Sequence, residues 1–433
     1  MRTLFVFALV HCLACGDGPA DSPDASSDDT GNFDASFDGG TEAHWIRGDV
    51  EVSLVEVYSA VDYTEGVLRR AWLPKDIAAH PDGQLWVVQH MERDPAYDDE
   101  TECIADAFER FGIPNDCVSL QGSTVAITDP ANPEPATASN GRARLIVDFN
   151  ALHFMRRPSA IAFGARELVL EPSHPGAEGS GLSAPVTYTN TFATCHEHHT
   201  ANATDMPPFI GPTLWTADPA IYNGENGDFP WSNGAHLDMV HATRYCMGIA
   251  YQSGNTYWTF DGNGGFLDRY DFGSPHHTGH HNHDDATIDR YFLPLGDELS
   301  RVPTVPSNML IHGDDLWVAD TGNGRVLRID LSAEATPVGM TRSFEGYDVE
   351  THEGLPYVEV LTTDEPSGLT RLPDGTMLVA DHATGELIVF ERDGTVIRTV
   401  ALPPGLGGLT NIGDTIYVVQ MNERRIARLT PGG

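Results

Sequence analysis

Short apolar runs separated by turn residues recur along the chain from about residue 50 to its end. Each copy has a Pro, Ser or Gly entry, a short apolar strand, a Gly/Asp turn and a second strand that ends in a polar loop. Runs of this length between Gly, Pro and Asp clusters predict β-strands joined by tight turns. Six copies of the pattern begin at residues 76, 159, 247, 308, 367 and 408.

The spacing of the copies predicts a β-propeller. The shortest interval, between residues 367 and 408, has the length of one four-stranded blade. The last copy supplies only three strands, and the alternating segment Val50–Tyr58 predicts its missing outer strand. Pairing the two ends of the chain in one blade closes the ring and removes an exposed sheet edge. We therefore predict an all-β, six-bladed propeller over residues 44–433, with seven blades as the alternative.

Two insertions lengthen this ring, at about residues 90–122 and 171–212. We take Glu167–Leu170 as the second strand of the blade that begins at residue 159. Both insertions are then predicted to lie between the second and third strands of their blades. Such loops share one face of a propeller with the connections between blades. Trp231, in a Pro-, Asn- and Gly-rich loop, is the tryptophan that we predict to contact a ligand.

The charge of the chain restricts its partners. Asp and Glu number 63 against 25 Lys and Arg, which gives a formal net charge of −38. Nucleic-acid binding requires a basic patch, so this composition excludes a nucleic-acid partner. A metal cation is the ligand that the field of such a protein opposes least.

The N-terminus predicts export. A basic start and an apolar run from Leu4 to Ala14 are typical of a secretory signal, which we place at residues 1–15. The segment from Leu13 to Gly16 resembles the cleavage box of bacterial lipoproteins. This resemblance implies lipidation of Cys15 and a lipid anchor in the membrane, at the outer membrane, the cell surface or in the periplasm. The alternative is an ordinary signal cut near Ala14.

Residues 16–43 are rich in Asp, Ser and Gly and have few apolar side chains. Such a segment buries too little surface to offset its chain entropy, so we predict a disordered tether. The remaining four cysteines of an exported chain predict two disulfides, with three connectivities open. A local Cys103–Cys117 bridge and a Cys195–Cys246 bridge between two loops of one face fit best; free buried thiols are the alternative.

Histidines supply two candidate metal sites. Imidazole with carboxylate is the usual ligand set for Zn²⁺ or Cu²⁺, and Ca²⁺ is a third candidate in so acidic a chain. The first set lies on the face of the insertions and consists of His198, His236, Asp238 and His241. The second lies in one dense loop predicted on the opposite face and consists of His276, His280, His283 and Asp284. The alternative for both is solvated histidines with no ion.

The segment from Val318 to Val326, Val-Ala-Asp-Thr-Gly-Asn-Gly-Arg-Val, resembles the NHL-repeat propeller family. That family includes binding platforms and enzymes. Its peptidyl-hydroxyglycine lyases hold zinc on histidines from different blades, which implies a metal-dependent lyase or hydrolase as one alternative. Our main prediction is a cell-envelope platform that binds a glycan, a peptide or a protein; metal binding by the His-rich loop is the third reading. Catalytic residues stay unassigned, because no Gly-x-Ser-x-Gly elbow occurs in the sequence.

Overall fold

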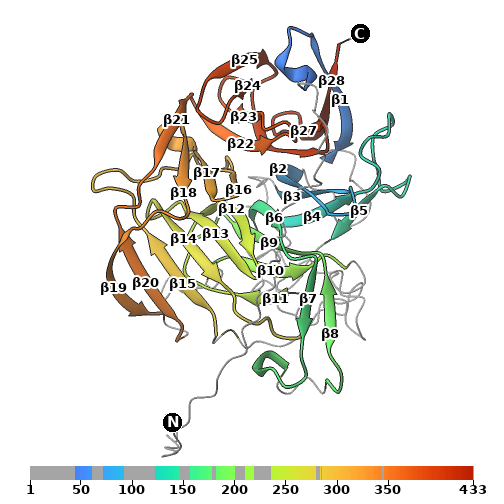
Figure 1. Ribbon diagram of the computed structural model, residues 1–433. Coiled ribbons are helices and arrows are strands. Elements are labelled where there is room, and N and C mark those ends of the chain that lie inside the picture. Colours follow the sequence, from blue (N-terminus) through green and yellow to red (C-terminus); the bar gives the residue numbers. More distant parts are fainter. Residues whose placement is uncertain are drawn as a thin grey trace, which may run out of the picture. The chain divides into compact units, whose positions relative to one another are not determined.

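The computed structural model describes most of the chain downstream of residue 43 (Figure 1). Regular structure there consists of β-strands and three single-turn 3₁₀ helices, η1 (Trp45–Arg47), η5 (Pro175–Ala177) and η6 (Thr321–Asn323). No helix in this part of the chain is long and apolar enough to cross a membrane. The described residues are 44–60, 72–91, 122–146, 157–177, 182–199, 210–218, 236–278, 283, 285–343 and 346–432.

Of the first three blades, blades 1 and 2 have four strands and blade 3 has six. Blade 1 consists of β2 (Trp72–Ala79), β3 (Leu85–Met91), β4 (Gly122–Ile127) and β5 (Ala143–Ile146). Blade 2 consists of β6 (Pro158–Phe163), β9 (Thr191–His196), β10 (Thr213–Thr216) and β11 (His236–Met239). Blade 3 consists of β12 (Cys246–Ser253), β13 (Thr256–Asp261), β14 (Phe266–Asp271) and β15 (Thr287–Tyr291), extended by β20 (Asp348–Glu353) and β19 (Thr336–Arg342).

The last three blades each have four strands. Blade 4 consists of β16 (Met309–His312), β17 (Asp315–Asp320), β18 (Arg325–Asp330) and β21 (Val358–Thr362). Blade 5 consists of β22 (Pro366–Arg371), β23 (Met377–Asp381), β24 (Glu386–Phe390) and β25 (Val396–Ala401). Blade 6 consists of β26 (Leu406–Ile412), β27 (Thr415–Gln420), β28 (Arg425–Pro431) and β1 (Val52–Ser59).

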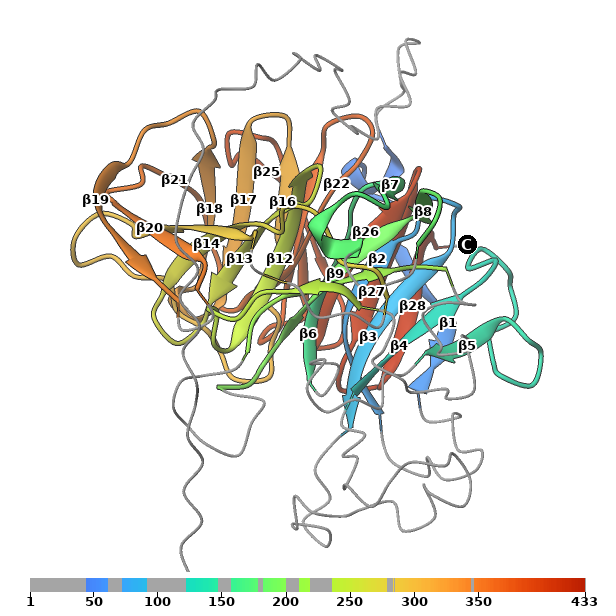
Figure 2. The same cartoon turned by 90° about the horizontal axis from the view of Figure 1, so that it is seen from below.

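The six blades form a closed ring. Their inner strands contact one another in the order β2, β6, β12, β16, β22 and β26, and β26 returns to β2 (Figures 1 and 2). The predicted six blades are therefore confirmed over the seven-bladed alternative. The predicted closure is also confirmed, because β1 pairs antiparallel with β28.

One predicted strand assignment is wrong. Glu167–Leu170 is β7, which among the described strands pairs only with β8 (Val186–Thr189), in a separate hairpin. The second strand of blade 2 is β9, so the insertion precedes this strand, and the predicted loop at 171–212 is incorrect. The residues of β7 and of β9 both have the composition of strands, and pairing with β6 decides which of the two belongs to the blade.

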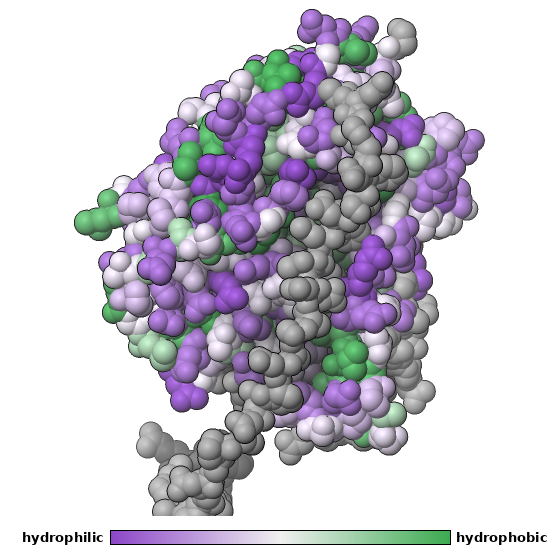
Figure 3. Space-filling model, in the orientation of Figure 1, coloured by the Kyte–Doolittle hydropathy of each residue, from purple (hydrophilic) through white to green (hydrophobic). Residues whose placement is uncertain are grey.

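Apolar side chains between blades form the core. Trp72, Trp86, Trp215 and Trp317 are almost completely buried, as expected for tryptophans in strands. Close packing at the axis depends on glycine: a Cβ on Gly408 would lie 2.0 Å from a carboxylate oxygen of Asp76 on β2. On the side drawn in Figure 3 the surface is mostly hydrophilic, with apolar side chains scattered over it.

Candidate metal centre

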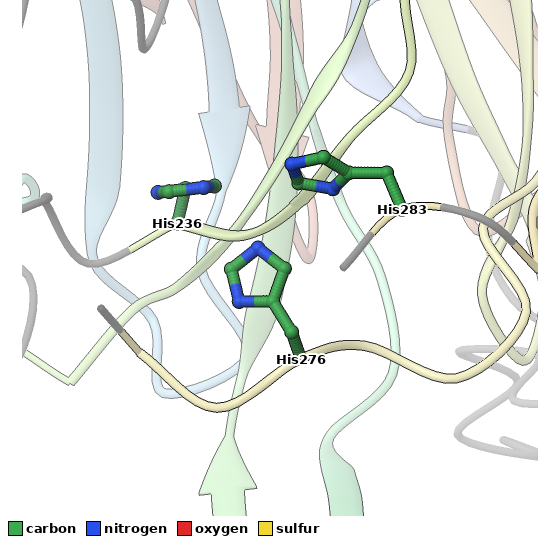
Figure 4. A group of neighbouring side chains, drawn as sticks. All are labelled: His236, His276 and His283. Carbon is green, nitrogen blue, oxygen red and sulfur yellow. The ribbon is translucent and has the colours of Figure 1, made fainter. Parts of the chain in front are cut away.

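Three histidines from two blades lie close together beside β11 (His236–Met239), the outermost strand of blade 2 (Figure 4). His236 is the first residue of β11, the outermost strand of blade 2. His276 and His283 come from the loop between β14 and β15 of blade 3. One ligand nitrogen from each ring lies within 4.8 Å of the other two, and the three residues are 0 to 9% exposed. The three imidazoles thus form a compact, buried donor set.

The loop lies there because it covers the edge of β11. The amide of His276 donates to the carbonyl of Leu237 at 2.9 Å, which uses a backbone group on an outer strand. At the base of the loop, the amide of Ser274 donates to the carboxylate of Asp285 at 2.9 Å. The first bond attaches the loop to blade 2, and the second closes the base of the loop within blade 3.

Hydrogen bonds select which nitrogen of each loop histidine faces the cluster. Nδ1 of His276 lies 2.8 Å from the carbonyl oxygen of His277, and a carbonyl only accepts, so Nδ1 carries the proton. Nδ1 of His283 lies 2.8 Å from Oδ1 of Asp238. In both rings Nε2 then holds the lone pair that could bind a metal. This pattern, with the far nitrogen held by a carbonyl or carboxylate, is typical of metal-ligating histidines.

Asp238 adds a carboxylate beside the histidines. Its side chain is 0% exposed, and burial raises its pKa to about 6, although the hydrogen bond from His283 lowers it in part. Its second oxygen, Oδ2, is buried and has no hydrogen-bond partner among the described residues. A buried carboxylate oxygen without a donor is costly unless a cation lies nearby.

A fourth histidine borders the cluster. His241 is 3% exposed, and its ring centroid lies 6.2 Å from that of His283. Its backbone is held by the hydroxyl of Tyr347, which accepts from the amide at 2.5 Å and donates to the carbonyl at 2.8 Å. Tyr347 directly precedes β20, so the extension of blade 3 supports this side of the site.

The structure therefore combines members of both predicted sets. The prediction that they lie on opposite faces is wrong, because His236 begins β11 instead of following it, and the blade 3 loop lies along that strand. His198 does not join the cluster; its ring stacks on His199 with centroids 4.8 Å apart. The predicted site residues that lie outside the described residues are Cys15, Cys103, Cys117, Trp231, His280 and Asp284.

A disulfide crosses the same junction. Cys195, on β9, and Cys246, at the start of β12, are bonded, with their Cα atoms 5.2 Å apart. This predicted pairing is confirmed, but the two cysteines lie in strands rather than loops. Blades 2 and 3 are thus joined covalently near their inner strands, while the histidines meet where a loop of blade 3 lies beside the outer strand of blade 2.

A second acidic cluster lies on the extended sheet of blade 3. Ligand atoms of Asp289, Glu350 and His352 also lie within 4.8 Å of one another, on partly exposed side chains. Asp289 already pairs with the guanidinium of Arg269 at 3.0 Å. Of the two clusters in the described part of the chain, only the three histidines are buried.

Fold and site together define a six-bladed β-propeller with a buried histidine cluster suited to a transition metal. No protein-family model and no curated protein matches the sequence. A catalytically inactive variant of virginiamycin B lyase from Staphylococcus aureus is 11% identical, with a TM-score of 0.44 over 88% of this chain and 99% of that chain. An auxiliary nutrient binding protein from Bacteroides thetaiotaomicron is 9% identical, with a TM-score of 0.45 over 88% and 76%.

PorZ, a bacterial surface component of the type-IX secretion system of Porphyromonas gingivalis, is 11% identical, with a TM-score of 0.36 over 88% of this chain and 38% of that chain. At such identities the similarity concerns the fold alone. Neither an activity nor a ligand follows from it.

Proposed function

We propose that this chain is a metal-binding propeller that holds one transition-metal ion between blades 2 and 3. The observation that carries the proposal is the convergence of His236, His276 and His283 on one buried point. Imidazole nitrogens suit Zn²⁺ and Cu²⁺, whereas Ca²⁺ prefers six or more oxygen ligands. Zn²⁺ is therefore the ion we favour of the three that the sequence suggested.

The role that fits this site best is structural. Catalytic zinc sites keep one coordination position open to substrate, whereas structural sites are closed by protein groups. Here Asp238 and His241 flank the three histidines, and both side chains are at most 3% exposed. These buried neighbours favour a structural ion that joins two blades over the catalytic ion of a metal-dependent lyase or hydrolase.

The test is elemental analysis of protein prepared without a histidine tag, followed by calorimetric titration of Zn²⁺ into chelator-treated protein. We expect one ion per chain, lost in His236→Ala and in His276→Ala. The matched control is His174→Ala, a histidine of the blade 2 insertion, which should keep the ion. Absence of stoichiometric metal, or retention of the ion by both site variants, contradicts the proposal.

A second candidate function is ligand binding by the propeller as a platform. A cavity of about 520 Å³ lies between blades 4 and 5. Its walls include Asp314 and Asp330 opposite Arg371, next to Trp317. Charged groups of both signs beside an aromatic ring suit a polar ligand such as a glycan or a peptide. Glycan and peptide arrays probed with the wild type and with Arg371→Ala test this proposal. Equal binding by the two proteins excludes the cavity as the binding site.

We further propose that the protein acts outside the cytoplasm on a lipid anchor at Cys15, in the outer membrane, at the cell surface or facing the periplasm. The Cys195–Cys246 disulfide supports an oxidising compartment. The lipoprotein-like segment before Gly16 supports the anchor. Metabolic labelling with a radioactive fatty acid should mark the wild type and not Cys15→Ala; equal labelling contradicts the anchor at this residue.

A further inference from the structure

The β7–β8 hairpin contacts the loop that carries the metal-site histidines. Within the described residues, β7 and β8 pair only with each other. Isolated two-stranded hairpins have marginal stability in water, so the order of this hairpin depends on its contacts with the rest of the fold. Leu170 and Tyr188, each 1% exposed, belong to the apolar cluster that includes residues of blades 2 and 3.

Tyr188 supplies the polar part of this contact. Its hydroxyl lies 2.6 Å from Nδ1 of His277 and accepts from the amide of Thr278 at 3.3 Å. His277 is in turn bonded through its carbonyl to Nδ1 of His276. One residue therefore separates the hydroxyl on β8 from a ligand of the proposed metal site.

We infer that a metal ion in the three-histidine site orders the β7–β8 hairpin through Tyr188. This inference rests on the proposed metal function. An ion that binds His236, His276 and His283 holds the loop against β11 and fixes the positions of His277 and Thr278. The hairpin then docks on groups that are already ordered, so the entropy cost of the docking falls. The occupied site is thus coupled to an element that does not contact the ion.

Hydrogen–deuterium exchange measured by mass spectrometry tests the coupling. Peptides covering 167–170, 186–189 and 272–286 are compared in chelator-treated protein with and without added Zn²⁺. In the wild type, Zn²⁺ should slow exchange in the loop and in the hairpin, the hairpin by about fivefold or more. In Tyr188→Phe, Zn²⁺ should slow exchange in the loop as before and no longer in the hairpin.

The matched control is Tyr58→Phe, which removes a tyrosine hydroxyl bonded to Gln89 in blade 1 and should leave the coupling unchanged. A hairpin that is protected by Zn²⁺ equally in the wild type and in Tyr188→Phe overturns the inference. So does a wild-type hairpin that ignores Zn²⁺ while the loop is protected. If neither segment responds and titration shows no binding, the proposed metal function itself fails, which is a different result.

Discussion

At the scale of single residues, the site depends on what holds the far nitrogen of each loop histidine. A carbonyl holds His276 and the carboxylate of Asp238 holds His283, so both rings direct Nε2 at one point. Neither role is visible in the spacing of the histidines. Asp238 does not need to touch the ion to matter, since orienting His283 already lowers the entropy cost of binding.

Asp238→Asn should therefore weaken metal binding without removing it. Loss of the charged acceptor lowers the affinity by roughly 10- to 100-fold, the usual effect of removing a group that orients a ligand histidine. Competition with a chromophoric chelator measures the affinity. Asp289→Asn, in the partly exposed cluster, is the control and should bind the ion as the wild type does. Unchanged affinity in Asp238→Asn contradicts the orienting role.

A second buried carboxylate lies at the axis of the ring. Burial raises the pKa of Asp76 to about 7, although the amide of Ile161 and the side chain of Asn308 donate to it. The folded-state pKa lies above the unfolded value, so the stability linked to this group is fully present below about pH 4. It is lost as the pH rises through about 7.

The difference in unfolding free energy between wild type and Asp76→Asn should change accordingly with pH. Between about pH 4 and pH 8 the wild type should lose on the order of 3 to 4 kcal/mol relative to the variant. Urea unfolding at several pH values measures this difference. Parallel pH profiles for the two proteins would show that Asp76 does not titrate in this window.

At the scale of elements, a disulfide and the histidine cluster both lie at the junction of blades 2 and 3. The core there includes small residues such as Ala160 and Ala193. The outer strand β11 has only four residues and an irregular register with β10. A short edge strand gains order from the loop that covers it, and an ion between them would add to this.

Removing the disulfide should destabilise this junction. Cys195 and Cys246 are 51 residues apart, and the chain-entropy estimate for such a loop is about 4 kcal/mol. Cys195→Ala with Cys246→Ala should lower the free energy of unfolding by about that amount in urea titrations, with the fold retained at low denaturant. Titration with added Zn²⁺ should recover part of the loss if the ion joins the same blades. A midpoint equal to that of the wild type contradicts the estimate.

At the scale of the whole molecule, stability depends on closing the ring. Blade 6 takes β26, β27 and β28 from the C-terminus and β1 from near the N-terminus of the described chain. Val57 and Tyr58 of β1 are buried, so loss of this strand exposes both apolar surface and the backbone edge of β28.

A chain that begins at residue 61 should be far less stable than one that begins at residue 44. The shorter chain lacks β1, and a loss of about 3 kcal/mol in a protein of this size lowers the midpoint by about 4 °C. Differential scanning calorimetry measures the midpoint, and size-exclusion chromatography detects pairing of the open β28 edge. Equal midpoints for the two chains would show that β1 is not needed for closure.

The sequence alone determined the fold, because a propeller is built from local repeats. Each blade is a run of consecutive strands with short turns, and the spacing of copies such as those at 367 and 408 reports its length. The incomplete last blade and the alternating Val50–Tyr58 segment also identified the closing strand. The Cys195–Cys246 pair was predicted as well, but from two loops on one face, whereas both cysteines lie in strands of neighbouring blades.

Only the tertiary structure decided the site. His236 and His283 lie 47 residues apart in different blades, and sorting loops by face separated them. They meet because β11 is an outer strand and the blade 3 loop covers its edge, a contact that no periodicity encodes. The strand β7 was misassigned for a related reason: Glu167–Leu170 and Thr191–His196 both have strand character, and pairing with β6 selects one of them. Local sequence patterns specify the strands and turns. Contacts between blades depend instead on which strand edges stay exposed once the ring has closed, and on which loops cover those edges.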